Sequence, residues 1–399
     1  MPTPLLILSD APTAGSGLGR ITKDLATRIH ANLSDMYRVG TIGYGGPYSR
    51  ALGFPQYSMD MKDWVIGNLP EVWFDFAGEE KGIILTIWDA SRMLWFSRPE
   101  TCEDPRLRKF LQSGHLSRWG YFPIDATGVD DKLTLVLKHI IEGYDRVLTY
   151  SDWAGKILER TLGKPVEAIP HGIDTSVFFP RNRVQARHLF GTRLGAKNIR
   201  GKKVGQPVSI ADDALLIGIV GTNQIRKDWG LGISTVAELT SERKVTLWCH
   251  TDVLERHWSL PALLHDFGLA EQSIVTLAQY PDEIMAWSYS ACDVTLGIGL
   301  GEGFGLPIFE SMACGTPCIH GNYGGAPEHI DNDFLVDPNY IYRIEGPYNC
   351  LRPVYQAVRW AAKADQVFDD KRRTALPLHL DWNNLWPSWA EWLKKGITQ

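Results

Sequence analysis

Two glutamates have a spacing that points to ligand chemistry. Glu302 lies within a glycine-rich loop, 299–305, and Glu310 follows eight residues later. The short, mostly apolar stretch 291–296 is typical of a buried strand, and apolar residues at helical spacing from Leu306 to Ala313 predict a helix after the loop. Such a loop at a helix N-terminus favours an anion. The candidate phosphate-binding residues are Gly303, Phe304, Gly305 and Leu306.

A phosphate held there would leave both carboxylates able to accept hydrogen bonds from hydroxyl groups. A phosphate beside several hydroxyl groups describes a nucleotide sugar. The alternative is a structural turn that carries two exposed glutamates, and a single glycine-rich loop does not distinguish the two.

A second strand, glycine loop and helix occur at the start of the chain. The apolar run 4–9 predicts a buried parallel strand, and an amphipathic helix follows to about residue 29. The loop between them contains Gly17, Leu18 and Gly19. It matches neither a dinucleotide-binding fingerprint nor a P-loop, so a tight structural turn is as well supported as a phosphate site.

Three further strands end in polar residues. The strand predicted at 82–88 ends at Asp89, the strand at 214–221 leads to Thr222, Asn223, Arg226 and Lys227, and the strand at 245–249 ends at His250. Ligands of open α/β sheets bind at the carboxyl ends of strands, so these residues are candidates. Asp89 has an alternative role as the cap of the following helix.

The composition is that of a globular protein with two domains. The 399 residues are 44% hydrophobic and 22% charged, and the net charge of −5 argues against a uniformly basic nucleic-acid binder. Six cysteines lack the paired spacing of a zinc site, which suggests buried thiols in a reducing cytoplasm. No run reaches transmembrane length, and no metal-binding cluster is recognisable.

One segment departs from this acidic balance. Residues 181–203 contain eight arginines and lysines and no acidic residue. A charge run of this kind is more often a solvated linker than a binding surface, and we favour the linker. The alternative is a contact with phosphates, including those of a DNA backbone.

The Glu302-x7-Glu310 spacing closely resembles the motif of retaining GT-B glycosyltransferases, the group that contains bacterial glycogen synthases and phosphatidylinositol mannosyltransferases. The resemblance extends to Gly-Thr-Pro at 315–317, Gly-Gly-Ala-Pro-Glu at 324–328 and Ile-Pro-His-Gly-Ile-Asp at 169–174. It implies two doubly wound, Rossmann-like α/β domains that face a cleft.

On this resemblance the chain divides into four parts. Residues 1–178 form an acceptor-side domain, 179–210 a basic inter-domain segment, and 211–375 a nucleotide-sugar domain. Residues 376–399 end in a helix that crosses back to the first domain. The motif at 169–174 is the hinge, where His171 is expected to be structural.

The resemblance also assigns roles to residues. Arg226 and Lys227 match a basic pair that neutralises the donor diphosphate, while a further family arginine is Thr222 here. Asp89 stands where many relatives carry a histidine that contacts the donor sugar. The implied catalytic residues are Arg226, Lys227, Glu302 and Asp89, and the implied donor-binding residues are Gly17, Leu18, Gly19, Thr222, Asn223, His250, Gly303, Phe304, Gly305, Leu306 and Glu310.

The implied reaction is sugar transfer from a nucleoside-diphosphate sugar, such as a UDP-sugar, with retention at the anomeric carbon. Neither a metal nor any other cofactor is expected. The acceptor is a carbohydrate, another small molecule or a hydroxymethylated base in DNA. A phosphorylase of similar fold and a non-catalytic sugar-nucleotide binder are the alternatives, and the basic pair with both glutamates argues against the second.

Overall fold

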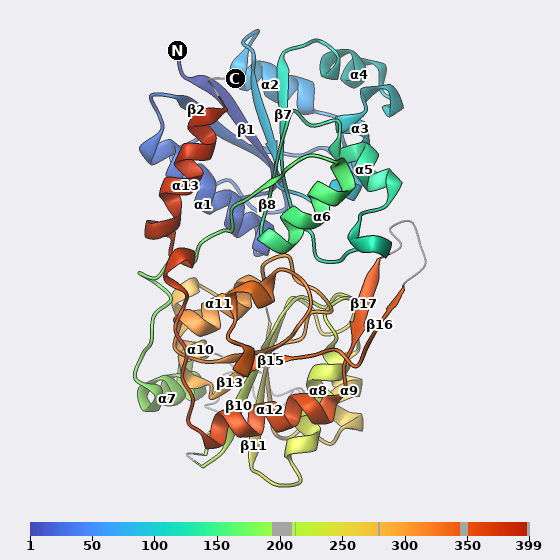
Figure 1. Ribbon diagram of the computed structural model, residues 1–399. Helices are drawn as coiled ribbons and strands as arrows, with labels where there is room; N and C mark the ends of the chain where they lie inside the picture. Colours follow the sequence, from blue (N-terminus) through green and yellow to red (C-terminus); the bar gives the residue numbers. More distant parts are fainter. Residues whose placement is uncertain (194–209, 212, 278–279, 344–349, 397–399) are drawn as a thin grey trace. The chain divides into compact units, whose positions relative to one another are not determined.

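The structure is a computed structural model that describes every residue except 194–209, 212, 278–279, 344–349 and 397–399 (Figure 1). It contains two compact units. The first holds Met1–His171 and the described residues from Trp386 onward, and the second holds Gly172–Arg343 and Leu351–Leu385. Each unit is built on a parallel sheet, as the alternation of apolar runs and amphipathic helices predicts.

Seven parallel strands form the sheet of the first unit, in the order β3-β2-β1-β6-β7-β8-β9. They are β1 (Thr3–Asp10), β2 (Tyr37–Tyr44), β3 (Gln56–Ser58), β6 (Gly82–Thr86), β7 (Leu116–Phe122), β8 (Arg146–Thr149) and β9 (Glu167–Ala168). The order reverses direction between β1 and β6. This is the topological switch point, where ligands of such sheets bind beyond the carboxyl ends of the strands.

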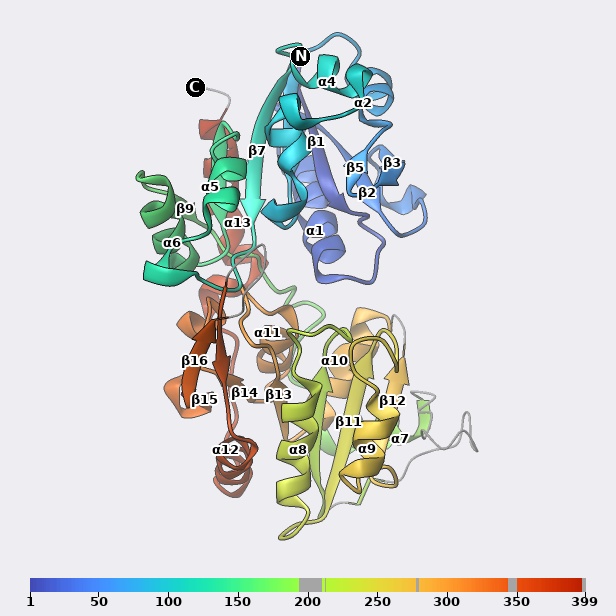
Figure 2. The same cartoon turned by 90° about the vertical axis from the view of Figure 1, so that its right-hand side faces the viewer.

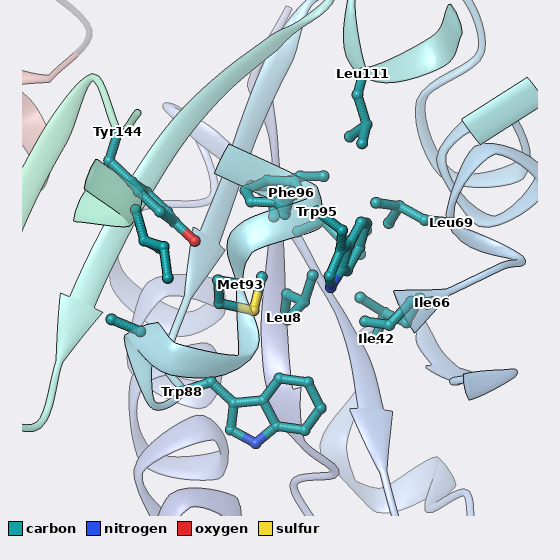
Figure 3. Packing of buried hydrophobic residues seen from close by; sticks show 14 of the residues in the cluster. Leu8, Ile42, Ile66, Leu69, Trp88, Met93, Trp95, Phe96, Leu111 and Tyr144 are labelled. Carbon is teal, nitrogen blue, oxygen red and sulfur yellow. The ribbon is translucent and has the colours of Figure 1, made fainter. Parts of the chain in front are cut away.

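Helices cover both faces of this sheet because its strands are apolar on both sides. The helices are α1 (Gly17–Asn32), α2 (Leu69–Ala77), α3 (Leu94–Ser97), α4 (Pro105–Leu111), α5 (Leu135–Ile141) and α6 (Asp152–Leu162). Leu6 and Leu8 pack in one buried cluster with residues of α2 to α6, part of which is shown in Figure 3. Leu5 and Ile7 are also fully buried, and by alternation they point to the opposite face.

Short elements complete the first unit. They are the hairpin β4 (Met61–Lys62) and β5 (Val65–Ile66), and the 3₁₀ turns η1 (Arg50–Leu52), η2 (Ala90–Arg92), η3 (Pro99–Thr101) and η4 (Val129–Asp131).

The last helix is α13 (Trp382–Lys395), whose residues from Trp386 onward belong to the first unit and pack there through Trp389 and Trp392. Trp389 donates from Nε1 to the Pro170 carbonyl at 2.9 Å, and its ring lies 4.8 Å from that of Tyr121. The Trp392 ring lies 5.2 Å from that of Trp119. The apolar stripe of this helix is therefore core.

His171 is the last residue of the segment Met1–His171 of the first unit, and its side chain is buried. Its Nδ1 lies 2.8 Å from the Tyr121 hydroxyl, which also donates to the Ile169 carbonyl at 2.8 Å. Burial lowers the pKa of His171 to about 3, so the ring is neutral at pH 7. These contacts suit the structural role expected of it.

Six parallel strands form the sheet of the second unit, in the order β12-β11-β10-β13-β14-β15. They are β10 (Leu215–Val220), β11 (Val245–Thr251), β12 (Ser273–Leu277), β13 (Val294–Gly297), β14 (Cys318–Gly321) and β15 (Leu335–Val336). The switch point here lies between β10 and β13. The loop with Thr222 and Asn223 leaves from β10, and the loop with Gly303 to Gly305 leaves from β13.

The helices of the second unit are α7 (Arg183–Arg193), α8 (Trp229–Leu239), α9 (Leu260–Asp266), α10 (Asp282–Ala291), α11 (Leu306–Ala313) and α12 (Ala357–Asp369). Figure 2 shows α8 and α9 alongside the paired strands β11 and β12. Outside the sheet are the antiparallel pair β16 (Tyr340–Arg343) and β17 (Leu351–Val354), and the turns η5 (Ala326–His329), η6 (Asn332–Phe334) and η7 (Leu378–Leu380).

The basic segment is only partly a solvated run. Within α7, Arg187 is 8% exposed and donates to the Ala214 carbonyl at 3.0 Å and to Asp293 at 2.5 Å. Arg183 pairs with the same carboxylate, and Arg181 lies over the Trp287 ring at 5.0 Å. These arginines anchor the helix within the second unit. Residues 194–203 of the segment lie outside the described residues.

Candidate active site

Three residues predicted from distant parts of the chain meet in the second unit. Arg226 Nη1 lies 3.0 Å from Glu302 Oε2, and Lys227 Nζ pairs with Glu302 Oε1. Glu302 is 6% exposed, and the side chains of Arg226 and Lys227 are 33% and 12% exposed. The structure therefore joins the predicted basic pair and the first predicted glutamate in one ion-paired cluster.

Loops that follow three adjacent strands build this cluster. The loop after β10 pairs with the loop after β13, because Asp228 N–H donates to Ile298 at 2.9 Å and Leu300 N–H donates to Arg226 at 2.8 Å. The loop after β14 joins them, since Gly325 N–H donates to the Glu302 carbonyl at 2.8 Å. The backbone fixes Glu302 independently of its carboxylate.

Two glycines are required by the close approach of these loops. A Cβ at Gly299 would lie 2.2 Å from Glu302 Oε1, and a Cβ at Gly324 would lie 2.7 Å from the Glu302 carbonyl oxygen. Gly324 also has a φ of +102°, which other residues rarely adopt. The glycines therefore make room for Glu302 itself.

Opposite charges control the protonation of Glu302. Burial alone would raise its pKa, but Arg226 and Lys227 outweigh burial and lower the pKa to about 2. The carboxylate is therefore charged at pH 7. In the structure Glu302 pairs with Arg226 and Lys227, the two cations that the sequence assigns to a diphosphate. The sequence-based prediction instead leaves the Glu302 carboxylate available to hydroxyl groups.

Helix α11 starts directly after this loop, as predicted. Gly305 is its N-cap residue at φ +93°, and Phe304 is 2% exposed and packs 4.6 Å from Phe309. Glu310 is 6% exposed on the same helix and accepts from the Tyr289 hydroxyl at 2.9 Å. Both predicted glutamates thus have protein partners in the second unit.

Asn223 supports the loop after β10. Its backbone N–H donates to Asp252 at 2.7 Å, and its side-chain amide donates to Val253 and Trp258 at 3.3 and 2.8 Å and accepts from Trp258 at 3.0 Å. It is fully buried. The neighbouring Thr222 is partly exposed and accepts from the Trp229 indole at 3.3 Å through its carbonyl.

His250 is the last residue but one of β11 and lies at the same sheet edge, since it is in register with Val220 at the end of β10. Its Nδ1 lies 2.8 Å from the Thr276 hydroxyl, and its ring stacks on Tyr280 at 5.3 Å. Burial lowers the pKa of His250 to about 4, so the ring is neutral at pH 7. This pair offers an aromatic surface near the charged cluster's sheet edge.

The loop Gly17-Leu18-Gly19 begins helix α1 at the switch point of the first unit. Ser16 caps this helix and accepts from Gly19 N–H at 3.1 Å. A Cβ at Gly19 would lie 2.7 and 2.8 Å from the carbonyl oxygens of Ala11 and Ala14. Gly19 is thus required because the backbone of the same loop leaves no room for a Cβ atom there.

Asp89 follows β6, on the other side of the same switch point. Its carboxylate, 50% exposed, lies 3.4 Å from Arg92 instead of capping η2. The capping alternative is therefore not what the structure shows. Nearby, Trp88 is fully buried and donates from its indole to Asp10 at 3.1 Å.

Two residues of the cluster were not predicted. His320 on β14 is fully buried beside Gly297, with Nδ1 2.6 Å from that carbonyl, and burial lowers its pKa although the Glu302 charge opposes this. Tyr289 on α10 holds Glu310. His320 follows the short apolar pair Cys318–Ile319, which was a usable signal of a strand end, whereas Tyr289 lies in the last turn of α10 and carries no such signal.

Two hollows are present in the second unit. A cavity of about 20 Å³, room for about one water molecule, lies against Lys227, Glu302 and Gly305. A hollow of about 420 Å³ is lined by His329, Asp331, Arg372 and Arg373 and contains none of the predicted residues. In the described part of the chain, no group of three or more His, Cys, Asp or Glu side chains is placed to hold a metal ion. None of the described helices is long and apolar enough to cross a membrane.

Comparisons with known proteins identify a family for part of the second unit. Residues 214–343 match the family described as "Glycosyl transferases group 1". The chain is 26% identical over 223 residues to a D-inositol 3-phosphate glycosyltransferase of Acidothermus cellulolyticus, a match that covers 52% of the chain and 45% of the relative. It is 25% identical over 243 residues to a GDP-mannose-dependent alpha-(1-6)-phosphatidylinositol monomannoside mannosyltransferase of Mycobacterium tuberculosis, with 58% and 56% covered. The matches thus span about half the length of these curated relatives.

The likeness in structure extends over the whole chain. The sucrose-phosphate synthase of Thermosynechococcus elongatus superposes with a TM-score of 0.72 over 99% of both chains, at 15% sequence identity. At this identity the superposition establishes the fold alone. The chain therefore has the GT-B fold, and its second unit carries a glycosyltransferase group 1 domain.

Proposed function

We propose that this chain transfers a sugar from a nucleoside-diphosphate sugar to a hydroxyl group of an acceptor, with retention at the anomeric carbon. The observation that carries the proposal is the cluster of Arg226, Lys227 and Glu302 at the switch point of the second unit. Two cations beside the start of α11 suit a departing diphosphate, whose charge grows in the transition state. The expectation of retention comes from the Glu302-x7-Glu310 motif.

Glu302 would hold the cations until the donor arrives. Its charge at pH 7 keeps Arg226 and Lys227 oriented, and an incoming diphosphate would compete with it for both. Once displaced, the carboxylate would accept hydrogen bonds from the hydroxyl groups of the donor sugar. The same residue would then serve the empty and the loaded site in different ways.

The nucleoside would lie against the predicted donor residues that remain. Glu310 would accept from ribose hydroxyls, and the stacked rings of His250 and Tyr280 would lie near the base. No metal is part of the proposal, because Arg226, Lys227 and the α11 N-terminus supply the positive charge. The assignment of Gly17, Leu18 and Gly19 to the donor stays a prediction.

A carbohydrate or small polyol is the proposed acceptor. The curated relatives are named for acceptors of these kinds, an inositol phosphate and a phosphatidylinositol mannoside. A DNA acceptor has less support, since Arg181, Arg183 and Arg187 of the basic segment are engaged within the second unit. Those arginines would have to leave their partners in order to track a DNA backbone.

A donor screen tests the proposal. Intact protein with EDTA present is heated with UDP-glucose, ADP-glucose or GDP-mannose, and the unfolding temperature is recorded. A donor at about 100 times its Kd adds about 2.7 kcal/mol to stability. We expect a clear rise with at least one donor, loss of the rise in Lys227→Ala, and its retention in the surface control Lys244→Ala, whose side chain is 72% exposed.

The positive donor is then followed by NMR. Appearance of the donor's own anomer in the transfer or hydrolysis product supports retention. Inversion would contradict the mechanism, and activity only with EDTA omitted would contradict metal independence. Phosphate-dependent breakdown of a glycoside without any nucleotide would favour a phosphorylase.

A further inference from the structure

A strained hairpin lies in the first unit. Lys62 of β4 pairs with Val65 of β5, so the turn between them is the two residues Asp63 and Trp64. Both have positive φ angles, 49° and 68°. Two-residue turns of this kind favour Asn-Gly, and a bulky ring at positive φ is rare because its Cβ crowds the backbone.

Contacts with one arginine and one buried tryptophan hold Trp64 in this conformation. The Arg92 guanidinium lies 4.0 Å from the centroid of the Trp64 ring and 5.3 Å from that of Trp88. The Trp64 and Trp88 rings are 5.9 Å apart and nearly perpendicular. Trp88 is fixed in turn, since it lies next to Met93 at the end of the buried cluster (Figure 3) and donates to Asp10.

This held ring remains accessible. Trp64 is 44% exposed although both Arg92 and Trp88 contact it. Next to it the Asp89 carboxylate is 50% exposed and lies 3.4 Å from Arg92. An exposed indole, a carboxylate and a guanidinium thus share one small area of the surface.

The area lies at the edge of the sheet where ligands bind. The hairpin follows the carboxyl end of β3, and Asp89 follows that of β6. Tyr44 ends β2 with 52% exposure, and Tyr48 in the next loop is 64% exposed. Aromatic side chains therefore gather at the carboxyl ends of neighbouring parallel strands.

We propose that Trp64, Arg92 and Asp89 form a subsite for the sugar ring of a carbohydrate acceptor. The indole would stack against the apolar C–H face of the sugar, while the carboxylate and the guanidinium bond its hydroxyl groups. The strained turn is explained if the ring is held in advance for this contact. The inference rests on the proposed glycosyl transfer, and it makes Asp89 an acceptor-binding residue.

A substitution that relieves the strain tests the subsite. Trp64→Gly removes the ring and suits the positive φ, so it removes the contact without introducing backbone strain. Phe74→Ala is the matched control, because Phe74 is an aromatic residue of the same unit with 46% exposure. Asp89→Asn removes the charge and keeps the ring, so it reports on the site even if Trp64→Gly lowers the unfolding temperature.

Saturation-transfer NMR on the intact chain is the measurement. The ligands are methyl α-glucoside, methyl α-mannoside, maltose and, as a different class, 5-hydroxymethylcytidine. We expect transfer to at least one sugar, at least a fivefold loss in Trp64→Gly, a smaller loss in Asp89→Asn and no change in Phe74→Ala. The rise in unfolding temperature with nucleotide sugar should be the same in Trp64→Gly and Phe74→Ala as in wild type.

Three results would overturn the subsite. They are no transfer to any of the sugars, equal transfer in wild type and Trp64→Gly, and transfer to 5-hydroxymethylcytidine alone. The unfolding temperature measured with nucleotide sugar distinguishes a failure of the subsite from a failure of the proposed function. A missing donor effect in the wild type contradicts the proposed function, whereas an intact donor effect with unchanged sugar contact contradicts only the subsite.

Discussion

The two units place a glycine loop at the same point of a similar sheet, but they fill it with different chemistry. In the second unit, the loop at 299–305 surrounds a buried carboxylate that holds Arg226 and Lys227. In the first unit, Ser16 caps helix α1, and Gly19 packs against the carbonyl oxygens of Ala11 and Ala14 in the loop before that helix. A strand, a glycine loop and a helix thus specify a turn, and the charged residues around the turn decide whether it suits an anion.

Because of this contrast, substitutions in the two loops should have different consequences. Removing a charge in the second unit should affect ligand binding and turnover first. Removing a cap or a glycine in the first unit should affect folding first.

The largest effect is expected from Arg226→Ala and Lys227→Ala. Each removes one positive charge from the proposed site of the departing diphosphate. Loss of one such group commonly lowers turnover by about 100- to 1,000-fold. The measurement is the initial rate of donor hydrolysis or transfer at saturating donor, with Lys244→Ala as the control on the same unit's surface. Wild-type rates in both variants would show that the basic pair has only a structural role as the partner of Glu302.

The next largest effect is expected from Glu302→Gln, which should lower the free energy of unfolding by an amount that depends on pH. The pKa of Glu302 is about 2 in the folded chain, below the ordinary value of 4.5. Its charge therefore stabilises the fold fully above pH 4.5, and this stabilisation is lost as the pH falls from 4.5 towards 2. A shift of this size corresponds to about 3 kcal/mol, and part of it is screened because Arg226 is one-third exposed. We expect Glu302→Gln to lose about 2–3 kcal/mol at pH 7.

Denaturant unfolding at pH 7 and pH 3 checks this effect. Wild type should lose part of its stability at pH 3, and Glu302→Gln should lose less between the two values. Asp10→Asn is the control in the first unit, since the amide oxygen can still accept from the Trp88 indole and the amide N–H can donate to the Ser16 hydroxyl, which now donates to Asp10. We expect it to cost less than about 1 kcal/mol. An equal cost for both substitutions would remove the contrast between the units.

The sequence predicts the elements of this contrast better than their pairing. Runs such as 4–9 and 214–221 are almost entirely apolar, which is sufficient to predict buried parallel strands, and the glycines predict the loops. Glu302 and Arg226 are 76 residues apart, and no local pattern says that the carboxylate binds the cations. That pairing depends on sheet order, which places β13 next to β10.

Helix α7 is a second case in which the sequence does not predict a pairing between distant residues. The eight charges of 181–203 predict a solvated run, yet Ala186 and Phe190 are buried at helical spacing and Arg187 finds Asp293. The two apolar residues four apart were a signal of a packed helix. The charge of Arg187 was misleading because its partner lies more than a hundred residues away.

Two glycine substitutions should give intermediate effects of different kinds. Gly19→Ala places a Cβ 2.7 Å from a backbone oxygen, which cannot move cheaply, so we expect about 1–3 kcal/mol of lost stability. Gly299→Ala meets the end of the Glu302 side chain at 2.2 Å, which can move away from Lys227. We expect Gly299→Ala to cost less stability and to reduce turnover more. Thermal unfolding and initial rates on both variants check the pair, and the reverse order would contradict the contrast.

The smallest effect is expected from Ser16→Ala. The substitution removes the cap of α1, where the hydroxyl accepts from Gly19 N–H at 3.1 Å, and loss of such a cap costs about 1 kcal/mol. In wild type the Ser16 hydroxyl already occupies Gly19 N–H, so we expect no donor phosphate to bond it, and the rise in unfolding temperature with nucleotide sugar should be the same in Ser16→Ala as in wild type. A donor phosphate that bonded Gly19 N–H would replace the lost hydroxyl, and the donor would then stabilise Ser16→Ala more than wild type. That larger rise would show that the loop of the first unit also binds the anion, as the family resemblance implies for Gly17, Leu18 and Gly19.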